Sequence, residues 1–360
     1  MKILHNKQSI GKRTGFLVLA VLLLLALSSC KAKDPSKKII GISAPSNNIQ
    51  RWAVETVLMK EELSRRGYEV IVQYASNDTS MQISQIENMI AKGAAVLIVI
   101  PIESASLGEA MDMAKEHGIP VISYDMLITN TDAVSYYTTF DNYKVGTIQG
   151  QYIKDKLDLD NAGRTYNMEI SAGDPGDNNA GFFFNAALDV LEPYIDSGSI
   201  NIVSGQDTFG QCATASWSTE IAQQRAENII ATYYSGRDVD IWLASADATA
   251  LGVSNALSVF YKGAYPIVTG QDCTLVSVKN ILNGKQGMSV FKDPKLLIAA
   301  TVNMVEEILS HKAVTVNDTE TYFNGVKVVP SFLCEPTYVD KDNCIEILTA
   351  AGFYTLEQLE

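Results

Sequence analysis

The chain has 360 residues, with 28 lysines and arginines against 41 aspartates and glutamates and a formal net charge of −13 at pH 7. Because an acidic chain of this kind repels polyanions, binding to nucleic acid is excluded as its function. The length is enough for two domains, each with a hydrophobic core of its own.

The first thirty residues predict export followed by lipidation. A basic stretch precedes the apolar run 16–27, which is too short to span a bilayer comfortably, and small residues then lead to Cys30. We therefore expect a signal peptide over 1–29, lipid on Cys30, and a polar tether over 30–38. This would hold the protein on the outer face of the bacterial cytoplasmic membrane, in a periplasm or at the cell surface. An uncleaved single-span anchor is the alternative.

From residue 39, short β-rich runs alternate with amphipathic stretches. The run AAVLIVIP over 94–101 is continuously apolar, which is typical of a strand in a parallel sheet that is covered on both faces. Strands are predicted at 39–44, 68–75, 94–101, 119–125 and 135–141, separated by helices near 50–66, 80–92 and 105–117.

The same alternation restarts after Asp141. Helices near 143–157, 179–194, 219–235 and 247–260 precede strands at 166–173, 200–206, 239–245 and 265–272. A helix near 274–283, a strand at 288–293, a helix to about 310, a strand at 326–332 and a helix near 343–350 complete the chain. Two sets of such units predict an α/β protein with two doubly wound, Rossmann-like lobes.

Polar and aromatic side chains follow several of these strands. In open α/β sheets ligands bind beyond the carboxyl ends of the strands, so these residues are candidates for a binding site. The candidates found in this way are Arg51, Trp52, Asp125, the segment 174–179, Asp247, Asp272 and Lys292. The set offers carboxylates, amides, cations and an indole, with almost no histidine.

Several of these strand ends also carry a family resemblance. RW (51–52), ISYD (122–125), DNNAGFFF (177–184), TGQD (269–272), VFKD (290–293) and NDTETYFNGVKVVPSFL (317–333) resemble segments of the sugar-binding receptors of ABC importers, the type I periplasmic binding proteins. The similarity is greatest to the xylose-binding and multiple-monosaccharide-binding receptors, and it runs from about residue 39 to the C-terminus.

The resemblance implies two lobes joined by a three-crossover hinge, with sugar held in the cleft between them. On that template the N-lobe comprises 39–141 plus 290–317, and the C-lobe comprises 142–289 plus 318–360. The resemblance is to binding proteins, so we expect no enzyme activity, no cofactor and no metal.

The resemblance also assigns roles to individual residues. Carboxylates accept hydrogen bonds from sugar hydroxyls, arginine and lysine donate them, and an indole covers the C–H face of the ring. The ligand-binding residues implied are Arg51, Trp52, Asp125, Asp177, Asn179, Trp217, Asp247, Asp272 and Lys292. Two alternatives stay open: Trp52 as a core residue, and Asp247 as a helix cap.

Two positions depart from the xylose-type pattern. Met126 stands where that pattern has arginine, and Ala246 stands where it has asparagine. Because a site without a partner for a hydroxyl discriminates against ligands that bury that hydroxyl, we expect a different or less hydroxylated sugar.

Four cysteines follow Cys30, and their pairing is open. Cys334 and Cys344 are the nearest pair, and the exported compartment permits a disulfide between them. Isolated, semi-buried thiols are the alternative.

The function predicted is that of a monomeric substrate-binding lipoprotein. It would capture a monosaccharide by hinge closure and deliver it to the membrane subunits of an ABC permease. The alternative is a sensory receptor for a sugar or a small furanosyl signal, acting in chemotaxis or on a kinase. A carbohydrate enzyme using Asp125 and Asp247 as acid and base is disfavoured, because no catalytic motif accompanies them.

Overall fold

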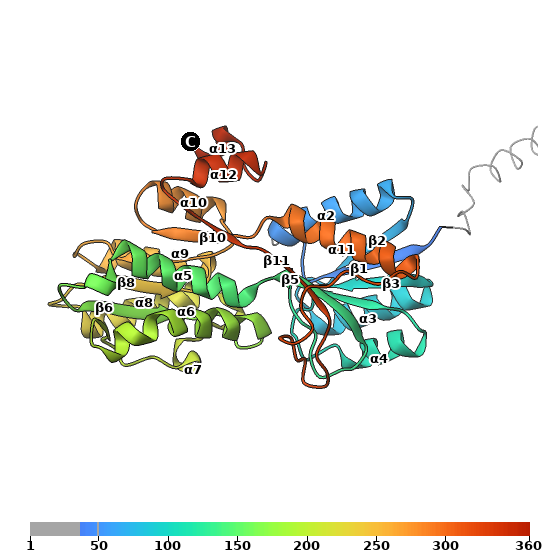
Figure 1. The fold of residues 1–360 in the computed structure, drawn as a ribbon, viewed down its shortest axis with the longest axis horizontal. Coiled ribbons are helices and arrows are strands. Elements are labelled where there is room, and N and C mark those ends of the chain that lie inside the picture. The colour runs from blue at the N-terminus through green and yellow to red at the C-terminus, as the bar shows by residue number, and fades with distance from the viewer. Residues whose placement is uncertain (1–36, 49) are drawn as a thin grey trace, which may run out of the picture. The chain divides into compact units, whose positions relative to one another are not determined.

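The computed structural model describes residues 37–48 and 50–360, and Ile39–Glu360 forms one compact unit (Figure 1). The predicted signal peptide, Cys30 and most of the tether lie outside the described residues. Among the described helices, none has both the length and the apolar character needed to cross a membrane.

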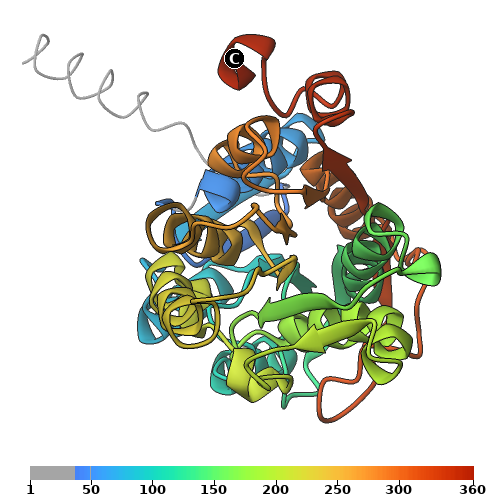
Figure 2. The same cartoon turned by 90° about the vertical axis from the view of Figure 1, so that its left-hand side faces the viewer.

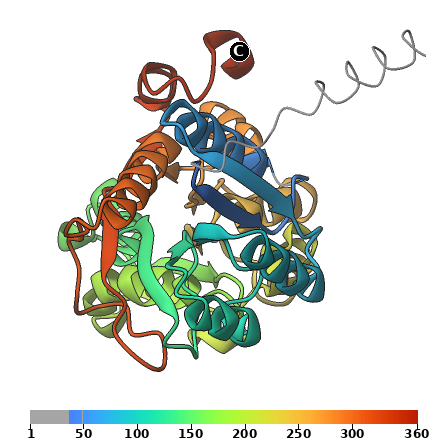
Figure 3. The same cartoon turned by 90° about the vertical axis from the view of Figure 1, so that its right-hand side faces the viewer.

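The first sheet has six strands, all parallel, in the order β11-β5-β4-β3-β1-β2. Its strands are β1 (Ile39–Ala44), β2 (Glu69–Tyr74), β3 (Ala94–Val99), β4 (Val121–Tyr124), β5 (Val134–Phe140) and β11 (Ser331–Cys334). The helices α2 (Gln50–Arg65) and α11 (Pro294–Leu309) cover one face, and α3 (Thr79–Ala91) and α4 (Gly108–Glu116) cover the other (Figure 3). We call this sheet with its helices the N-lobe.

The apolar run in β3 explains the two covered faces. Because side chains alternate along a strand, Val96 and Ile98 pack with α2 and α11, whereas Leu97 and Val99 pack with α3 and α4. All four side chains are fully buried, as expected for a central parallel strand.

The second sheet has four parallel strands in the order β7-β6-β8-β9. These are β6 (Tyr166–Ser171), β7 (Ile200–Ile202), β8 (Ile241–Ala244) and β9 (Ile267–Val268). The helices α5 (Asn142–Lys156) and α6 (Asn178–Asp196) cover one face, and α8 (Thr219–Tyr233) and α9 (Asp247–Phe260) cover the other (Figure 2). We call this sheet with its helices the C-lobe.

The remaining elements extend the C-lobe. An antiparallel pair, β10 (Met288–Phe291) and β12 (Thr337–Asp340), follows α10 (Leu275–Leu282). The chain ends with α12 (Cys344–Ala350) and α13 (Leu356–Leu359), which pack with α10, and a short α7 (Phe209–Cys212) lies before α8.

The chain passes between the lobes three times. It leaves the N-lobe after β5, returns between β10 and α11, and leaves again between β11 and β12. The predicted α/β fold, with two doubly wound lobes and a three-crossover hinge, is therefore confirmed.

Two predicted boundaries are wrong. Val290 and Phe291 were expected in the N-lobe, but they belong to β10, which pairs with β12 in the C-lobe. Residues 318–334 were expected in the C-lobe, but β11 pairs with β5, and the Asn324 amide donates to the backbone oxygens of Ile128 and Thr131. The strand predicted at 326–332 begins only at Ser331, because Pro330 has no N–H for a sheet ladder; its carbonyl instead accepts from Tyr137. The third crossover thus follows Cys334.

Two glycines bring α5 and α6 into close contact. A Cβ atom on Gly146 would collide with the backbone oxygen of Phe183, and one on Gly150 would lie 2.8 Å from that of Ala187. The two glycines are four residues apart, so they share one face of α5.

We expect Gly146→Ala to destabilise the protein by about 1–3 kcal/mol, because the added methyl group overpacks a helix interface. Chemical denaturation checks this value. Gly181→Ala on α6 is the matched control, since a Cβ there meets nothing within 4 Å. The control should be neutral or stabilising, and an equal loss in both variants would contradict the packing argument.

Candidate functional site

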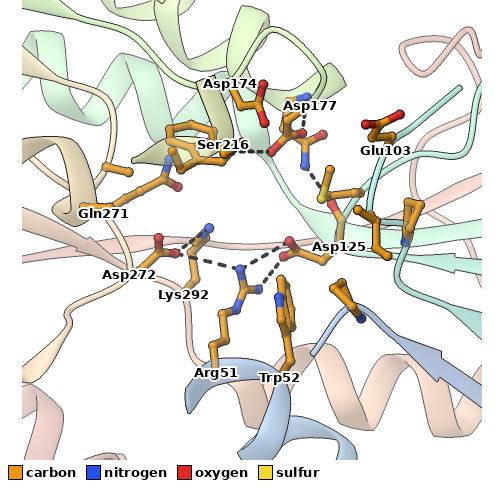
Figure 4. Close-up of a pocket in the computed structure, with 18 of the residues that line it drawn as sticks. Arg51, Trp52, Glu103, Asp125, Asp174, Asp177, Ser216, Gln271, Asp272 and Lys292 are labelled. Carbon is orange, nitrogen blue, oxygen red and sulfur yellow. Dashed lines mark hydrogen bonds and ion pairs between the residues drawn. The ribbon is translucent and has the colours of Figure 1, made fainter. Parts of the chain in front are cut away.

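A cavity of about 560 Å³ lies at the carboxyl ends of the strands and is lined by both lobes (Figure 4). Eight of the nine predicted site residues line it: Arg51, Trp52, Asp125, Asp177, Asn179, Trp217, Asp272 and Lys292. Its volume is within the range of small-molecule sites. That these side chains bind a ligand remains a prediction.

Strained backbone turns direct several of these side chains into the cavity. Asp125, Trp217 and Asp272 have φ values of 63°, 53° and 92°, in the region that non-glycine residues rarely adopt. Such conformations persist only where the surrounding structure enforces them, and they gather at binding sites.

A chain of ion pairs crosses the cavity from one lobe to the other. The Arg51 guanidinium pairs with both carboxylate oxygens of Asp125, and its Nη1 lies 3.8 Å from Asp272 Oδ1 (Figure 4). The same Asp272 oxygen lies 2.8 Å from Lys292 Nζ. We call the four residues Asp125, Arg51, Asp272 and Lys292 the charged chain.

Burial and neighbouring charges act in opposite directions on Asp272. Burial would raise the pKa of Asp272, but Lys292 and Arg51 together outweigh it and lower that pKa. Asp272 is therefore ionised at neutral pH and accepts hydrogen bonds only.

Behind the charged chain, Glu55 holds Arg51 in place. Glu55 accepts from Arg51 Nε at 2.8 Å and from the hydroxyl of Tyr124 at 2.5 Å. Burial raises the pKa of Glu55, and this effect exceeds the opposing effect of Arg51.

The two tryptophans wall the cavity in different ways. Trp52 belongs to the N-lobe core and also lines the cavity, with the Arg51 guanidinium 4.4 Å from its ring centre. Its role in binding a ligand stays a prediction. Trp217 donates from Nε1 to Asp177 at 3.3 Å. A Cβ on Gly173 would overlap the Trp217 ring, so a glycine is required beneath it.

Asp177 is a buried carboxylate at the start of α6. It is the N-cap residue, and its Oδ1 accepts from the backbone N–H of Asn179 at 2.9 Å. Burial raises the pKa of Asp177 from 3.8 to about 7, and the two hydrogen bonds that it accepts only partly oppose this.

The raised pKa predicts a pH dependence of stability. Between about pH 4 and pH 7 the folded protein holds a proton on Asp177 that the unfolded chain releases, so this stabilisation is complete at low pH and is lost as pH rises through 7. The shift corresponds to roughly 4 kcal/mol at most. Relative to Asp177→Asn, ligand-free wild type should lose stability over this range in pH-dependent denaturation. If the unfolding free energies of the two proteins vary with pH in the same way, the raised pKa is not that of Asp177.

Asn179 joins the lobes through its side chain. From α6 of the C-lobe, its Nδ2 donates to the backbone oxygen of Asp125 at 2.7 Å, and its Oδ1 accepts from Tyr137 and Asn142 at 3.0 Å each. The Asp125 oxygen also accepts from Tyr137 at 2.7 Å and from Thr139 at 3.0 Å, so the strained Asp125 backbone is held from both lobes.

We expect Asn179→Ala to loosen the lobes and to cost about 1–3 kcal/mol of unfolding free energy, because buried hydrogen-bonding groups lose their partners. X-ray scattering of the ligand-free protein should show a larger radius of gyration. Asn178→Ala, one residue away and outside the cavity lining, is the control. Identical scattering from Asn179→Ala and wild type would be evidence against the link.

The structure does not bring Asp247 to the cavity. This carboxylate is 1% exposed, and it accepts from the backbone N–H of Thr274 at 2.7 Å and from Gln286 and Ser289 at 2.9 Å. It joins α9, α10 and β10, and the N-cap position of α9 belongs to Ala246. Asp247 is thus a structural residue, and the prediction of a ligand here is corrected.

Several lining residues are not among those predicted from the sequence. Gln271 precedes Asp272 in the TGQD segment, and its Nε2 donates to Ser245 O at 2.8 Å, whereas its buried Oε1 has no hydrogen-bond partner among the described residues. Its position beside a strand-end aspartate was the available signal. Further lining residues are Pro45, Asn77, Pro101, Ile102, Glu103, Phe183, Ser216, Ala248 and Thr274. Asp174 also lines the cavity and belongs to the candidate segment 174–179.

Cysteine pairing and metal binding find no support in the part of the chain that the structure describes. Cys212, Cys273, Cys334 and Cys344 are buried free thiols, so Cys334 and Cys344 do not form a disulfide. No group of three or more histidine, cysteine, aspartate or glutamate side chains between residues 37 and 360, residue 49 aside, is arranged to hold a metal ion.

Comparison with known proteins identifies the class. A family model described as a periplasmic binding protein domain matches residues 40–313. The multiple sugar-binding periplasmic protein SbpA of Azospirillum brasilense is 39% identical over 97% of both chains. The D-xylose-binding periplasmic protein of Escherichia coli (strain K12) is 34% identical over 95% of this chain and 98% of the relative.

A solved structure is similar throughout. An ABC transporter solute-binding protein from Clostridium phytofermentans with bound β-D-glucose is 52% identical, with a TM-score of 0.87 over 90% of this chain and 100% of that chain. The chain therefore belongs to the periplasmic binding protein family, as the resemblance implied. The relatives are periplasmic sugar-binding proteins, and the chain is classed with them and not with enzymes.

Proposed function

We propose that this protein captures a monosaccharide in the inter-lobe cavity and delivers it to an ABC importer. The observation that carries the proposal is the charged chain, which lines the cavity and draws its members from both lobes. A ligand that contacts this chain would contact both lobes at once.

The chemistry of the cavity suits a sugar. Asp125 and Asp272 accept hydrogen bonds, and Arg51 and Lys292 donate them, so sugar hydroxyls can both donate and accept hydrogen bonds here. Trp217 offers an aromatic surface for the C–H groups of a sugar ring. An unpaired buried hydroxyl would cost about 1–3 kcal/mol, so such a set selects ligands whose hydroxyls match it.

We propose D-glucose as the first ligand to test. The relative from Clostridium phytofermentans binds β-D-glucose and is 52% identical to this chain. Met126 and Ala246 line the cavity and bring no charged group to it, so that part of the wall would discriminate by shape.

Hinge closure supplies the mechanism. In this proposal the moving bodies are 39–141 with 294–334, and 142–291 with 337–360, and sugar stabilises the closed form through contacts that exist only there. The closed monomer would then dock on the permease subunits, held near them by lipid on Cys30. The competing role is sensory, and it would use the same site with a different partner.

We expect wild type to bind D-glucose and Arg51→Ala to lose roughly 2–5 kcal/mol of binding free energy, because Asp125 loses its cationic partner and Asp272 keeps only Lys292. Isothermal titration calorimetry on protein freed of carried-over sugar measures both. Arg66→Ala is the matched control: Arg66 also pairs with two glutamates, Glu62 and Glu306, but lies outside the cavity lining.

Unchanged binding in Arg51→Ala would place the sugar elsewhere. A role in import can be distinguished from a role in sensing by measuring the uptake of labelled glucose in cells that lack the gene. Lost uptake, restored by wild type but not by Arg51→Ala, is the result expected for an importer component. Normal uptake would favour the sensory role.

A further inference from the structure

The charges that line the cavity are unbalanced. Two of its side chains are cationic, Arg51 and Lys292, whereas five are carboxylates: Glu103, Asp125, Asp174, Asp177 and Asp272. Figure 4 shows Glu103 on the N-lobe side and Asp174 and Asp177 on the C-lobe side of the same space.

Both cations are already occupied by carboxylates. Arg51 pairs with Asp125, Glu55 and Asp272, and Lys292 pairs with Asp272. An anionic ligand that recruited either cation would have to share it with the protein carboxylates that already pair with it, which weakens those pairs in a buried site.

Three of the carboxylates have no cationic partner among the described residues. Asp177 accepts only from a backbone N–H and the Trp217 indole and is 9% exposed. Asp174 accepts from the backbone N–H of Gly176 at 2.9 Å, and Glu103 accepts from the Ser106 hydroxyl at 2.6 Å. A negative group on a ligand would therefore meet the unpaired carboxylate of Glu103 on the N-lobe side and that of Asp174 on the C-lobe side, whereas Asp177, whose pKa burial raises to about 7, is only partly ionised near neutral pH.

We propose, building on the proposed function, that this cavity selects uncharged sugars and rejects sugar acids, with Glu103 and Asp174 as the specificity-determining residues at its edge. This selection is independent of the orientation of the sugar in the cavity, because carboxylates without a cationic partner come from both lobes. Neither Glu103 nor Asp174 is assigned to holding the sugar itself.

The test compares three ligands by calorimetry at pH 7.5 and low salt. D-glucuronate should bind at least about 100-fold more weakly than D-glucose, since like charges disfavour association. D-glucuronamide has the size of glucuronate without its charge, and it should bind within about tenfold of glucose, because one altered polar group is worth roughly 1 kcal/mol.

The double variant Glu103→Gln with Asp174→Asn assigns the effect to these two residues. It should reduce the ratio of glucose affinity to glucuronate affinity by at least about tenfold, because the neutral amides keep the size of the acids and remove their charge. In wild type, 0.5 M salt should also reduce this ratio of affinities, since salt screens the charges at the exposed edge of the cavity.

Each outcome distinguishes the two proposals. Glucose binding with glucuronate equally tight, or with glucuronamide as weak as glucuronate, would overturn the charge selection alone. If neither the double variant nor salt reduces the ratio of glucose affinity to glucuronate affinity, Glu103 and Asp174 do not determine the selection. If none of the three ligands binds, the proposal of D-glucose as the ligand fails, and this inference fails with it.

Discussion

Arg51 is surrounded by three carboxylates in the cavity between the lobes, and the organisation of the site depends on this one guanidinium. Glu55 accepts a hydrogen bond from its Nε, and Asp125 accepts from its terminal nitrogens. Asp272 Oδ1, on the C-lobe side, lies 3.8 Å from Nη1. Removing charges from water is costly, and a buried ion pair is weak support for stability on its own. We therefore interpret this cluster as serving to hold and orient a ligand.

The backbone around the cluster follows from the same requirement. Asp125 and Asp272 adopt strained conformations that carry their carboxylates toward Arg51, and the Asp125 carbonyl is held by Tyr137, Thr139 and Asn179. Because Asn179 lies in the C-lobe, the orientation of an N-lobe carboxylate depends on the distance between the lobes. This gives a direct physical connection between hinge closure and the geometry of the site.

Much of the fold was predictable because each strand carries its own signal. The continuous apolar run of β3, the alternation of β-rich and amphipathic segments, and the restart after Asp141 all correspond to elements of the structure. The polar residues at strand ends could be predicted as a group, because parallel strands end at one edge of a sheet.

The remainder depended on contacts between segments distant in the sequence. Nothing local indicates that β11 pairs with β5, that Asp247 turns toward Thr274 and Ser289, or that Gly173 leaves room for Trp217. Asp247 shows the point well, because it follows a strand end as Asp125 does, yet its carboxylate lies among C-lobe donors. Whether the side chain of such a residue points into the cavity or toward other protein groups depends on which distant segments pack beside it.

The most direct measurement is a crystal structure of the protein with D-glucose. The account predicts the sugar ring in the cavity, with hydroxyls within hydrogen-bonding distance of Asp125 or Arg51 on the N-lobe side and of Asp272 or Lys292 on the other. A sugar held by one lobe alone, or bound outside this cavity, would contradict it.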